Sequence, residues 1–165
     1  MDQPYAMDLQ LHIHCIWLPD SLDGVLKNIH PLLNAALLGH LRAMGHGDEI
    51  AIVDRNFPAA SCAARLVDLP GTTITEVAEA VFSVFPVDTF VTPASFRMGP
   101  VGDEATEVAA HQEFQAAMEA GEGRPVDTEA LERYAFYERV RGAYVVVSTS
   151  DDRPYANFVV VKGVV

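Results

Sequence analysis

The sequence of 165 residues contains few basic residues and few cysteines. Its 11 lysines and arginines are outnumbered by 23 aspartates and glutamates, which gives a formal net charge of −12. A charge of this sign repels phosphate backbones and anionic lipid surfaces, so we expect no nucleic acid partner and no membrane partner. The two cysteines, Cys15 and Cys62, show no CxxC or Cys/His metal spacing. We therefore expect no disulfide scaffold, and we expect the protein to be cytoplasmic.

Long apolar runs and several common catalytic motifs are also missing. The longest early run, residues 11–18, is too short to span a bilayer and lacks the basic flank of a signal peptide. The sequence has no glycine-rich phosphate loop, no GxSxG elbow and no HExxH motif. His12 and His14 alternate as metal ligands on a strand would, but no third ligand accompanies them. Several large enzyme classes are thereby disfavoured, and we expect no metal site.

Hydrophobic residues, by contrast, make up 50% of the chain, enough to form the core of one domain. Residues 1–24 show no strong periodicity and end in a cluster of proline, aspartate, serine and glycine. We interpret them as an N-terminal extension. The patterned domain is expected to span residues 25–165.

Local patterns predict helices and short strands in alternation. Asn34 is suited to cap a helix that Gly45 ends, and the apolar run at residues 50–53 is typical of a strand covered on both faces. Thr73 begins a capping-box helix that stops by Pro86.

The second half of the chain is expected to continue in the same manner. Residues 88–98 are predicted to be extended, at an edge or in a bent strand because of Pro93. Helix formers dominate residues 104–120, residues 126–132 resemble a helix start, and helical spacing continues over 133–143. Two β-branched runs near the C-terminus predict a hairpin or adjacent strands. The whole pattern predicts a layered α/β domain with a mixed sheet.

Two residues near the first predicted strand could carry chemistry. His46 lies between Gly45 and Gly47, which leave room for a ligand, although a histidine at a helix end can simply stabilise the helix dipole. Asp54 follows the strand, where open α/β sheets bind ligands, although it could equally cap a turn. Eight extended residues span roughly 26 Å. The two residues can therefore share a site only if the loop folds back or if two subunits contribute.

Two weaker groups of candidates lie further along the chain. Arg133 and Tyr137 fall on a predicted helix, where tyrosines often pack and charges face water. Tyr155 and Asn157 lie in a predicted turn, and their hydroxyl and amide groups suit a ligand rich in hydroxyls.

Taken together, the segments NIHPLLNAALLGHLRAMGHGDEIAIVDRNFPA, FYERVRGAYVVV and PYANFVVVKGV resemble the RbsD/FucU family of L-fucose mutarotases and D-ribose pyranases over residues 25–165. GHGDEI, FP and FYER are similar to the fucose branch. The resemblance implies a three-layer α/β/α domain with a mixed sheet. It also implies a sugar mutarotase without a cofactor, in ring-shaped homo-oligomers that share active sites between neighbours.

The resemblance also assigns roles to individual residues. It places the catalytic histidine at His46 and substrate-binding residues at Asp54, Arg133 and Tyr155–Asn157, which includes Ala156, while Tyr137 is expected to line the site. The implied reaction interconverts the α and β anomers of L-fucose by acid/base-catalysed ring opening and reclosure. The triplet Tyr-Ala-Asn is more like the ribose branch, so a D-ribose pyranase or a mutarotase of another aldose is an alternative. A non-catalytic sugar-binding protein is another.

Overall fold

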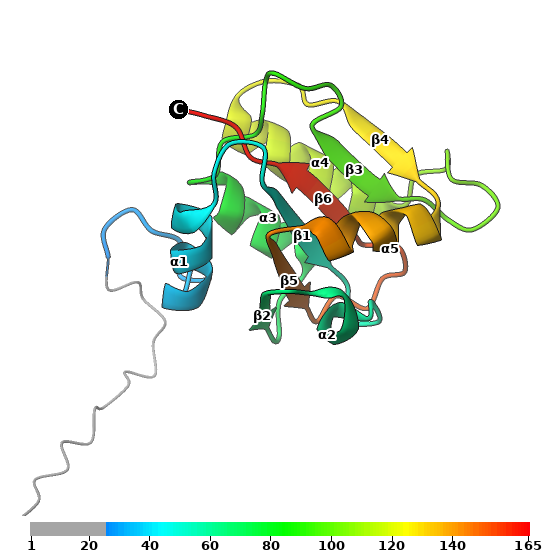
Figure 1. Cartoon of the computed structure of the whole chain (residues 1–165), viewed down its shortest axis with the longest axis horizontal. Helices are drawn as coiled ribbons and strands as arrows, with labels where there is room; N and C mark the ends of the chain where they lie inside the picture. The colour runs from blue at the N-terminus through cyan, green and yellow to red at the C-terminus, as the bar shows by residue number, and fades with distance from the viewer. Residues whose placement is uncertain (1–25) are drawn as a thin grey trace, which may run out of the picture.

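A mixed six-stranded sheet forms the middle layer of the structure, a computed structural model that describes residues 26–165 (Figure 1). The predicted extension at residues 1–24, with His12 and His14, lies outside the described residues. The strands are β1 Glu49–Val53, β2 Leu66–Leu69, β3 Ser95–Met98, β4 Thr128–Leu131, β5 Val145–Thr149 and β6 Phe158–Val161. The helices are α1 Ala35–Ala43, α2 Ala59–Cys62, α3 Ile74–Phe82, α4 Ala109–Glu122 and α5 Arg133–Gly142.

The order of strands in the sheet is β2-β5-β1-β6-β3-β4. β6 runs antiparallel to both of its neighbours, β1 and β3, whereas the other paired strands are parallel. The predicted mixed sheet is thus confirmed. The predicted pairing of the two C-terminal runs is wrong, because β1 lies between β5 and β6.

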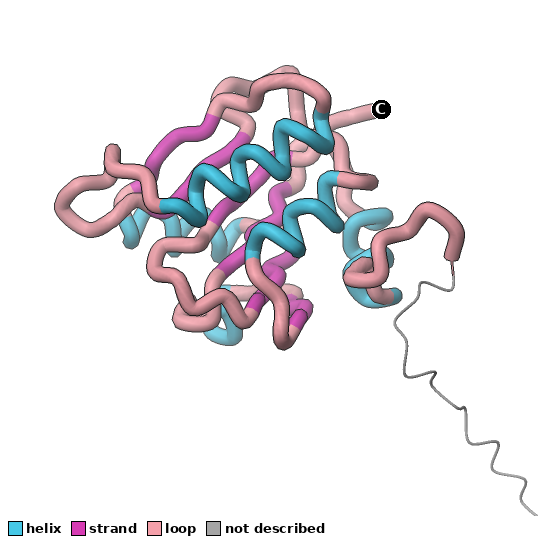
Figure 2. The backbone as a smooth tube through the Cα atoms, turned by 180° about the vertical axis from the view of Figure 1, so that it is seen from behind, coloured by secondary structure: helices cyan, strands magenta, loops and turns pink. Residues whose placement is uncertain are grey.

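Helices cover both faces of the sheet, which confirms the three-layer α/β/α architecture. Figure 1 looks onto the face that carries α5, and Figure 2, from behind, shows α3 and α4 across the other face. On the α3/α4 side, the ring of Phe114 stacks on that of Phe158 at 3.8 Å between centroids. On the α5 side, Phe136 and Val140 pack against Ala51 and other strand residues. Alternate residues of each strand therefore enter two separate cores.

The predicted caps of the first two long helices are confirmed. The Asn34 side chain accepts a hydrogen bond from the backbone N–H of Leu37, and α1 ends at Ala43, shortly before Gly45. Thr73 and Glu76 form a reciprocal capping box at the start of α3. Local side-chain chemistry is sufficient to fix these helix starts.

Three predicted segments differ from the structure. Residues 128–131 form β4 rather than a helix start, because pairing with β3 overrides a weak local helix preference. α4 begins at Ala109 rather than near residue 104, since the carbonyls of residues 104–106 accept hydrogen bonds from Arg97. Of the two alternatives predicted around Pro93, the edge strand is wrong: β3 lies between β6 and β4 and starts two residues after Pro93, so the ladder does not need that missing N–H. Among residues 26–165, no helix is long and apolar enough to cross a membrane.

Candidate active site

Most of the predicted site residues lie at one end of the strands of the sheet. β1, β3 and β4 finish at this edge, formed by the strand ends, and the antiparallel β6 begins there. Asp54 directly follows β1, Arg133 comes soon after β4, and Asn157 directly precedes β6. Open α/β sheets bind ligands at the carboxyl ends of their strands, next to a change in strand order. The topology therefore brings together residues that are up to about a hundred positions apart in sequence.

These residues line a cavity of about 170 Å³. Pockets for drug-sized ligands are typically about 300–1,000 Å³, so this one suits a smaller molecule. Its lining combines one carboxylate, one guanidinium, two amides and two phenol groups with a few apolar side chains. The lining residues are Asp54, Asn56, Phe57, Met98, Arg133, Tyr137, Pro154, Tyr155 and Asn157.

Asp54 and Asn157 form a reciprocal hydrogen-bonded pair at the base of the cavity. The Asn157 side-chain amide donates to Asp54 Oδ2 at 2.6 Å, and its Oδ1 accepts from the Asp54 backbone N–H at 3.0 Å. The other carboxylate oxygen accepts from the backbone N–H groups of Asn56 and Phe57, each at 2.9 Å. Asp54 is 4% exposed and Asn157 is fully buried. Both side chains are therefore held in fixed orientations before any ligand binds.

Burial dominates the electrostatics of this pair. It raises the pKa of Asp54, although the hydrogen bonds from Asn157, Asn56 and Phe57 act in the opposite direction. A ligand that donates hydroxyl hydrogens to the carboxylate would supply part of the solvation that burial removes.

Arg133 and Tyr137 reach the cavity from the first two turns of α5. The Arg133 guanidinium lies 4.7 Å from the centre of the Tyr134 ring, and its Nη2 donates to the Tyr134 hydroxyl at 2.9 Å. Its buried Nε makes no hydrogen bond within the described part of the chain. Tyr137 packs edge-on against Phe57, and burial raises the pKa of its hydroxyl. Arg133 and Tyr137 thus present hydrogen-bond donors to the cavity at neutral pH.

Tyr155 and Ala156 complete the turn that leads into β6. Tyr155 lines the cavity and adopts a left-handed backbone conformation with φ of 64°. Ala156 does not line the cavity, because its fully buried side chain packs into the core on the α3/α4 side. Any contact of Ala156 with a ligand would have to come from its backbone.

His46 lies at the opposite edge of the sheet, before β1 begins. The backbone N–H of its neighbour Gly47, which has φ of 85°, donates to the carbonyl of Lys162, just beyond β6. β1 has five residues, which rise about 16 Å. The fold of one chain therefore does not bring His46 to the cavity that contains Asp54.

A buried carboxylate orients the His46 ring. Nε2 lies 3.1 Å from Oδ1 of Asp88, and the side chains are 46% and 2% exposed respectively. Burial alone would raise the pKa of Asp88, but hydrogen bonds from the Phe90 N–H, His46 and the Thr89 N–H lower it below its ordinary value. Asp88 is therefore an ionised acceptor, so Nε2 carries the hydrogen and Nδ1 is left available. The Phe90 ring packs edge-on beside the imidazole at 5.2 Å.

Sequence reasoning missed Asp88, which is 42 positions from His46, and the cavity residues Asn56, Phe57, Met98 and Pro154. Asn56, Phe57 and Pro154 lie next to predicted site residues, so proximity in the chain could have suggested them. Asp88 had no such signal. Within residues 26–165, no cluster of three histidine, cysteine, aspartate or glutamate side chains could hold a metal ion.

Comparison with known proteins identifies the family. Residues 27–165 match the model of the RbsD / FucU transport protein family. The chain belongs to the RbsD/FucU family. This confirms the resemblance seen in the GHGDEI, FYER and PYAN segments.

Relatives within the RbsD/FucU family match most of the chain. It is 36% identical over 140 residues to an L-fucose mutarotase of Glaesserella parasuis, covering 85% of this chain and 96% of that protein. The crystal structure of FucU from Bifidobacterium longum superposes with a TM-score of 0.79, at 34% identity over 84% of this chain and 99% of the other. The fucose mutarotase of Streptococcus pneumoniae, in complex with L-fucose, gives a TM-score of 0.75 at 33% identity, over 85% and 99% of the two chains.

Proposed function

We propose that this protein is an L-fucose mutarotase, an isomerase that interconverts the α and β anomers of the sugar. The single observation that carries this proposal is the preformed cavity of Asp54, Arg133, Tyr137, Tyr155 and Asn157, in a chain similar to a fucose mutarotase that binds L-fucose. Carboxylate, guanidinium, phenol and amide groups can each bond sugar hydroxyls, and no net charge is needed in the ligand. The cavity binds the sugar, and His46 supplies the proton transfer.

The reaction requires ring opening and reclosure. His46 is the principal proton donor: it gives a proton to the ring oxygen as the bond from that oxygen to the anomeric carbon breaks. Solvent water takes the proton of the anomeric hydroxyl as the base at the same time, and reclosure on the other face of the aldehyde reverses both transfers. Imidazole suits this task because its ordinary pKa is close to neutral pH. Asp88 holds Nε2, so Nδ1 exchanges protons with the sugar.

The active site is completed between copies of the chain. His46 and the cavity lie at opposite edges of one sheet, so each cavity takes its histidine from a neighbouring copy. The partly exposed His46 and the strongly exposed Phe90 beside it present an aromatic surface suited to such a contact. Head-to-tail contacts close into a ring when the rotations between successive copies add up to a full turn, and we propose that they do so here. Size-exclusion chromatography with light scattering should therefore report an assembly well above a dimer.

The acidic composition and the buried free thiol of Cys62 support a cytoplasmic location without nucleic acid or membrane partners.

The activity is tested by saturation-transfer NMR between the two anomeric signals of L-fucose, with D-ribose and other aldoses in parallel. Faster exchange of L-fucose than of the other sugars is the expected result. Preference for D-ribose would reassign the substrate to the alternative that Tyr155-Ala156-Asn157 suggests. Binding without faster exchange would identify a non-catalytic sugar-binding protein.

The shared site is tested by mixing two inactive variants. His46→Ala lacks the proton donor, and Arg133→Ala lacks a sugar-binding group. When the two are unfolded and reassembled together at equal amounts, about a quarter of the sites should combine an intact cavity with an intact histidine. Activity near that fraction supports sites shared between copies. A mixture that stays inactive, although each variant assembles normally, contradicts them.

A further inference from the structure

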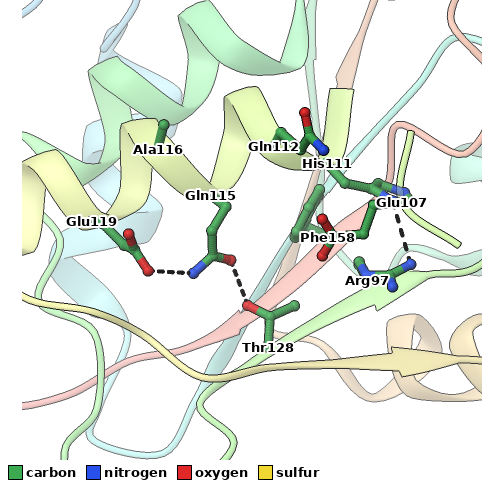
Figure 3. Close-up of a pocket in the computed structure, with 9 residues that line it drawn as sticks. All are labelled: Arg97, Glu107, His111, Gln112, Gln115, Ala116, Glu119, Thr128 and Phe158. Carbon is green, nitrogen blue, oxygen red and sulfur yellow. Dashed lines mark hydrogen bonds between the residues drawn. The ribbon is translucent and has the colours of Figure 1, made fainter. Parts of the chain in front are cut away.

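A second histidine, His111, lies on the first turn of α4, where it lines a pocket separate from the sugar cavity (Figure 3). It is 2% exposed, and its Nε2 lies 2.8 Å from the backbone carbonyl of Tyr155. A carbonyl oxygen can only accept a hydrogen bond, so Nε2 carries the hydrogen and donates it. His111 therefore donates a hydrogen bond to the backbone of Tyr155, a residue that lines the sugar cavity.

The other ring nitrogen fixes the charge state of His111. Nδ1 lies 3.3 Å from the backbone nitrogen of Val108 and 3.3 Å from Nη1 of Arg97. Both of these groups are donors, so Nδ1 must present a lone pair. The surroundings thus select a neutral imidazole with one tautomer, and the dashed line in Figure 3 marks its contact with Arg97.

The carbonyl that His111 holds is the centre of the turn before β6. It also accepts a hydrogen bond from the backbone N–H of Asn157 at 2.8 Å. Tyr155 adopts its left-handed conformation without being a glycine, a conformation that persists only when the surroundings impose it. Because Tyr155 and Asn157 flank this carbonyl and both line the cavity, its position sets the direction of both side chains.

Burial and the positive charge of Arg97 oppose protonation of the ring. Arg97 on β3 is 6% exposed, and its guanidinium donates to the carbonyls of residues 104–106; none of the ion pairs found within residues 26–165 includes it. Glu107, in the loop before α4, is the carboxylate that faces the ring. Burial lowers the pKa of His111, and the charge of Arg97 adds to this, against the opposing effects of the Tyr155 carbonyl and Glu107.

We propose that His111 is a positioning residue of the sugar site: the neutral imidazole donates to the Tyr155 carbonyl and thereby orients Tyr155 and Asn157. A proton added at Nδ1 faces the donors of Val108 and Arg97, which push the charged ring away from its place and so release the turn. The role in sugar binding rests on the function proposed above. The role in holding the turn does not, because its contacts lie within the chain itself.

Three variants distinguish a loss of the turn's position from a general loss of fold stability. His111→Leu removes the donor to Tyr155, whereas His111→Gln keeps an N–H group near the place of Nε2. Met118→Ala, in the same helix and also fully buried, removes core packing without touching the turn. All three variants should lower the melting temperature, which makes Met118→Ala the control for a general loss of stability.

The sugar-free measurement follows the backbone amides of Tyr155 and Asn157 by NMR. His111→Leu should shift both signals and speed the hydrogen exchange of the Asn157 amide, while His111→Gln and Met118→Ala should leave them close to wild type. Unchanged signals in His111→Leu would overturn the positioning role, whatever the protein binds.

The sugar measurement follows the affinity for L-fucose in the same variants. His111→Leu should weaken it by about tenfold, the size of one lost hydrogen bond, with a smaller change in kcat. In a His46→Ala background, acidification should weaken binding more than it does when His111→Gln is added. Equal losses in His111→Leu and Met118→Ala, or identical pH profiles with and without His111→Gln, would overturn the proposal. Failure of the wild-type protein to bind any aldose would instead refute the proposed function.

Discussion

Replacing Asp88 with asparagine isolates the electrostatic part of the contact with His46. The asparagine side-chain oxygen can still accept from the imidazole and from the backbone N–H groups of Thr89 and Phe90, so the turn keeps its hydrogen bonds. Only the charge is lost. A hydrogen bond to a charged group contributes about 1.5–3 kcal/mol and a neutral one about 0.5–1.5, a difference of about 1–1.5 kcal/mol.

That difference corresponds to about a 5- to 12-fold slower exchange, since a factor of ten in rate is about 1.4 kcal/mol. His46 is 46% exposed, and solvent screening weakens its interaction with the carboxylate. We therefore expect the lower end, about fivefold, with the loss in kcat rather than in KM, because Asp88 does not line the cavity. Saturation-transfer NMR on L-fucose measures both constants, and circular dichroism checks the fold.

Asp48→Asn is the matched control for this variant. Asp48 accepts a hydrogen bond from the Gly45 N–H at 2.7 Å. The Asp48→Asn substitution therefore removes the same charge close to His46 without changing a contact of the imidazole. The control should exchange L-fucose anomers at the wild-type rate. If Asp88→Asn is as fast as wild type, or if Asp48→Asn is equally slow, the carboxylate of Asp88 does not act through the imidazole.

Further predictions concern the catalytic residue, the cavity, acid stability and the N-terminus. His46→Ala should lose most of the catalysed exchange with an unchanged circular dichroism spectrum; normal exchange would reduce His46 to a helix-end residue. Asp54→Asn should mainly raise KM, because an amide makes weaker hydrogen bonds to sugar hydroxyls than a carboxylate; a loss confined to kcat would contradict a binding role. Burial alone would raise the pKa of Asp151, but hydrogen bonds, chiefly from Arg153, lower it below its ordinary value. The ionised carboxylate therefore stabilises the fold when the pH is above the ordinary carboxyl pKa. This stabilisation is lost as the pH falls through the folded-state pKa of Asp151. In urea unfolding, Asp151→Asn should cost about 1.5–3 kcal/mol at neutral pH, and the cost should shrink steadily as pH falls below the ordinary carboxyl pKa; a cost that does not change with pH would exclude the ionised pair as the cause. A chain that begins at Val25 should keep its fold and activity, and an insoluble or inactive product would show that the preceding residues belong to the domain.

Sequence patterns predict the elements of this fold better than their arrangement. Asn34 and Thr73 identify helix starts correctly because a cap is a contact between residues three positions apart. Residues 128–131 form a strand only because β3 lies beside them, and their own sequence carries no such information. The order of β5, β1 and β6 depends on contacts about a hundred residues apart, so two neighbouring runs in the sequence were wrongly paired.

In the candidate site, too, sequence patterns predict individual residues better than the contacts between distant residues. The resemblance placed Asp54, Arg133, Tyr155 and Asn157, and the structure brings all four to one cavity. From sequence, His46 and Asp54 can share a site only if the loop folds back or if two subunits contribute, and their positions at opposite ends of β1 rule out the first alternative. The partners of these residues were beyond sequence reasoning, because the hydrogen bond between Asp54 and Asn157 spans 103 positions. Only the folded chain shows which side chains hold the site residues in place.

The central place of β6 has a consequence for how the protein folds. β6 is the last strand in sequence, yet it alone joins the half-sheet β2-β5-β1 to the half-sheet β3-β4. Neither half can bury its inner edge until β6 arrives, and its pairs with β1 join residues more than a hundred positions apart. Such long-range pairing slows folding and makes it cooperative. During synthesis, the inner strands of the two half-sheets therefore stay unpaired on one side until β6 has been made. The sugar cavity borders β6, so it is the last part of the domain to form.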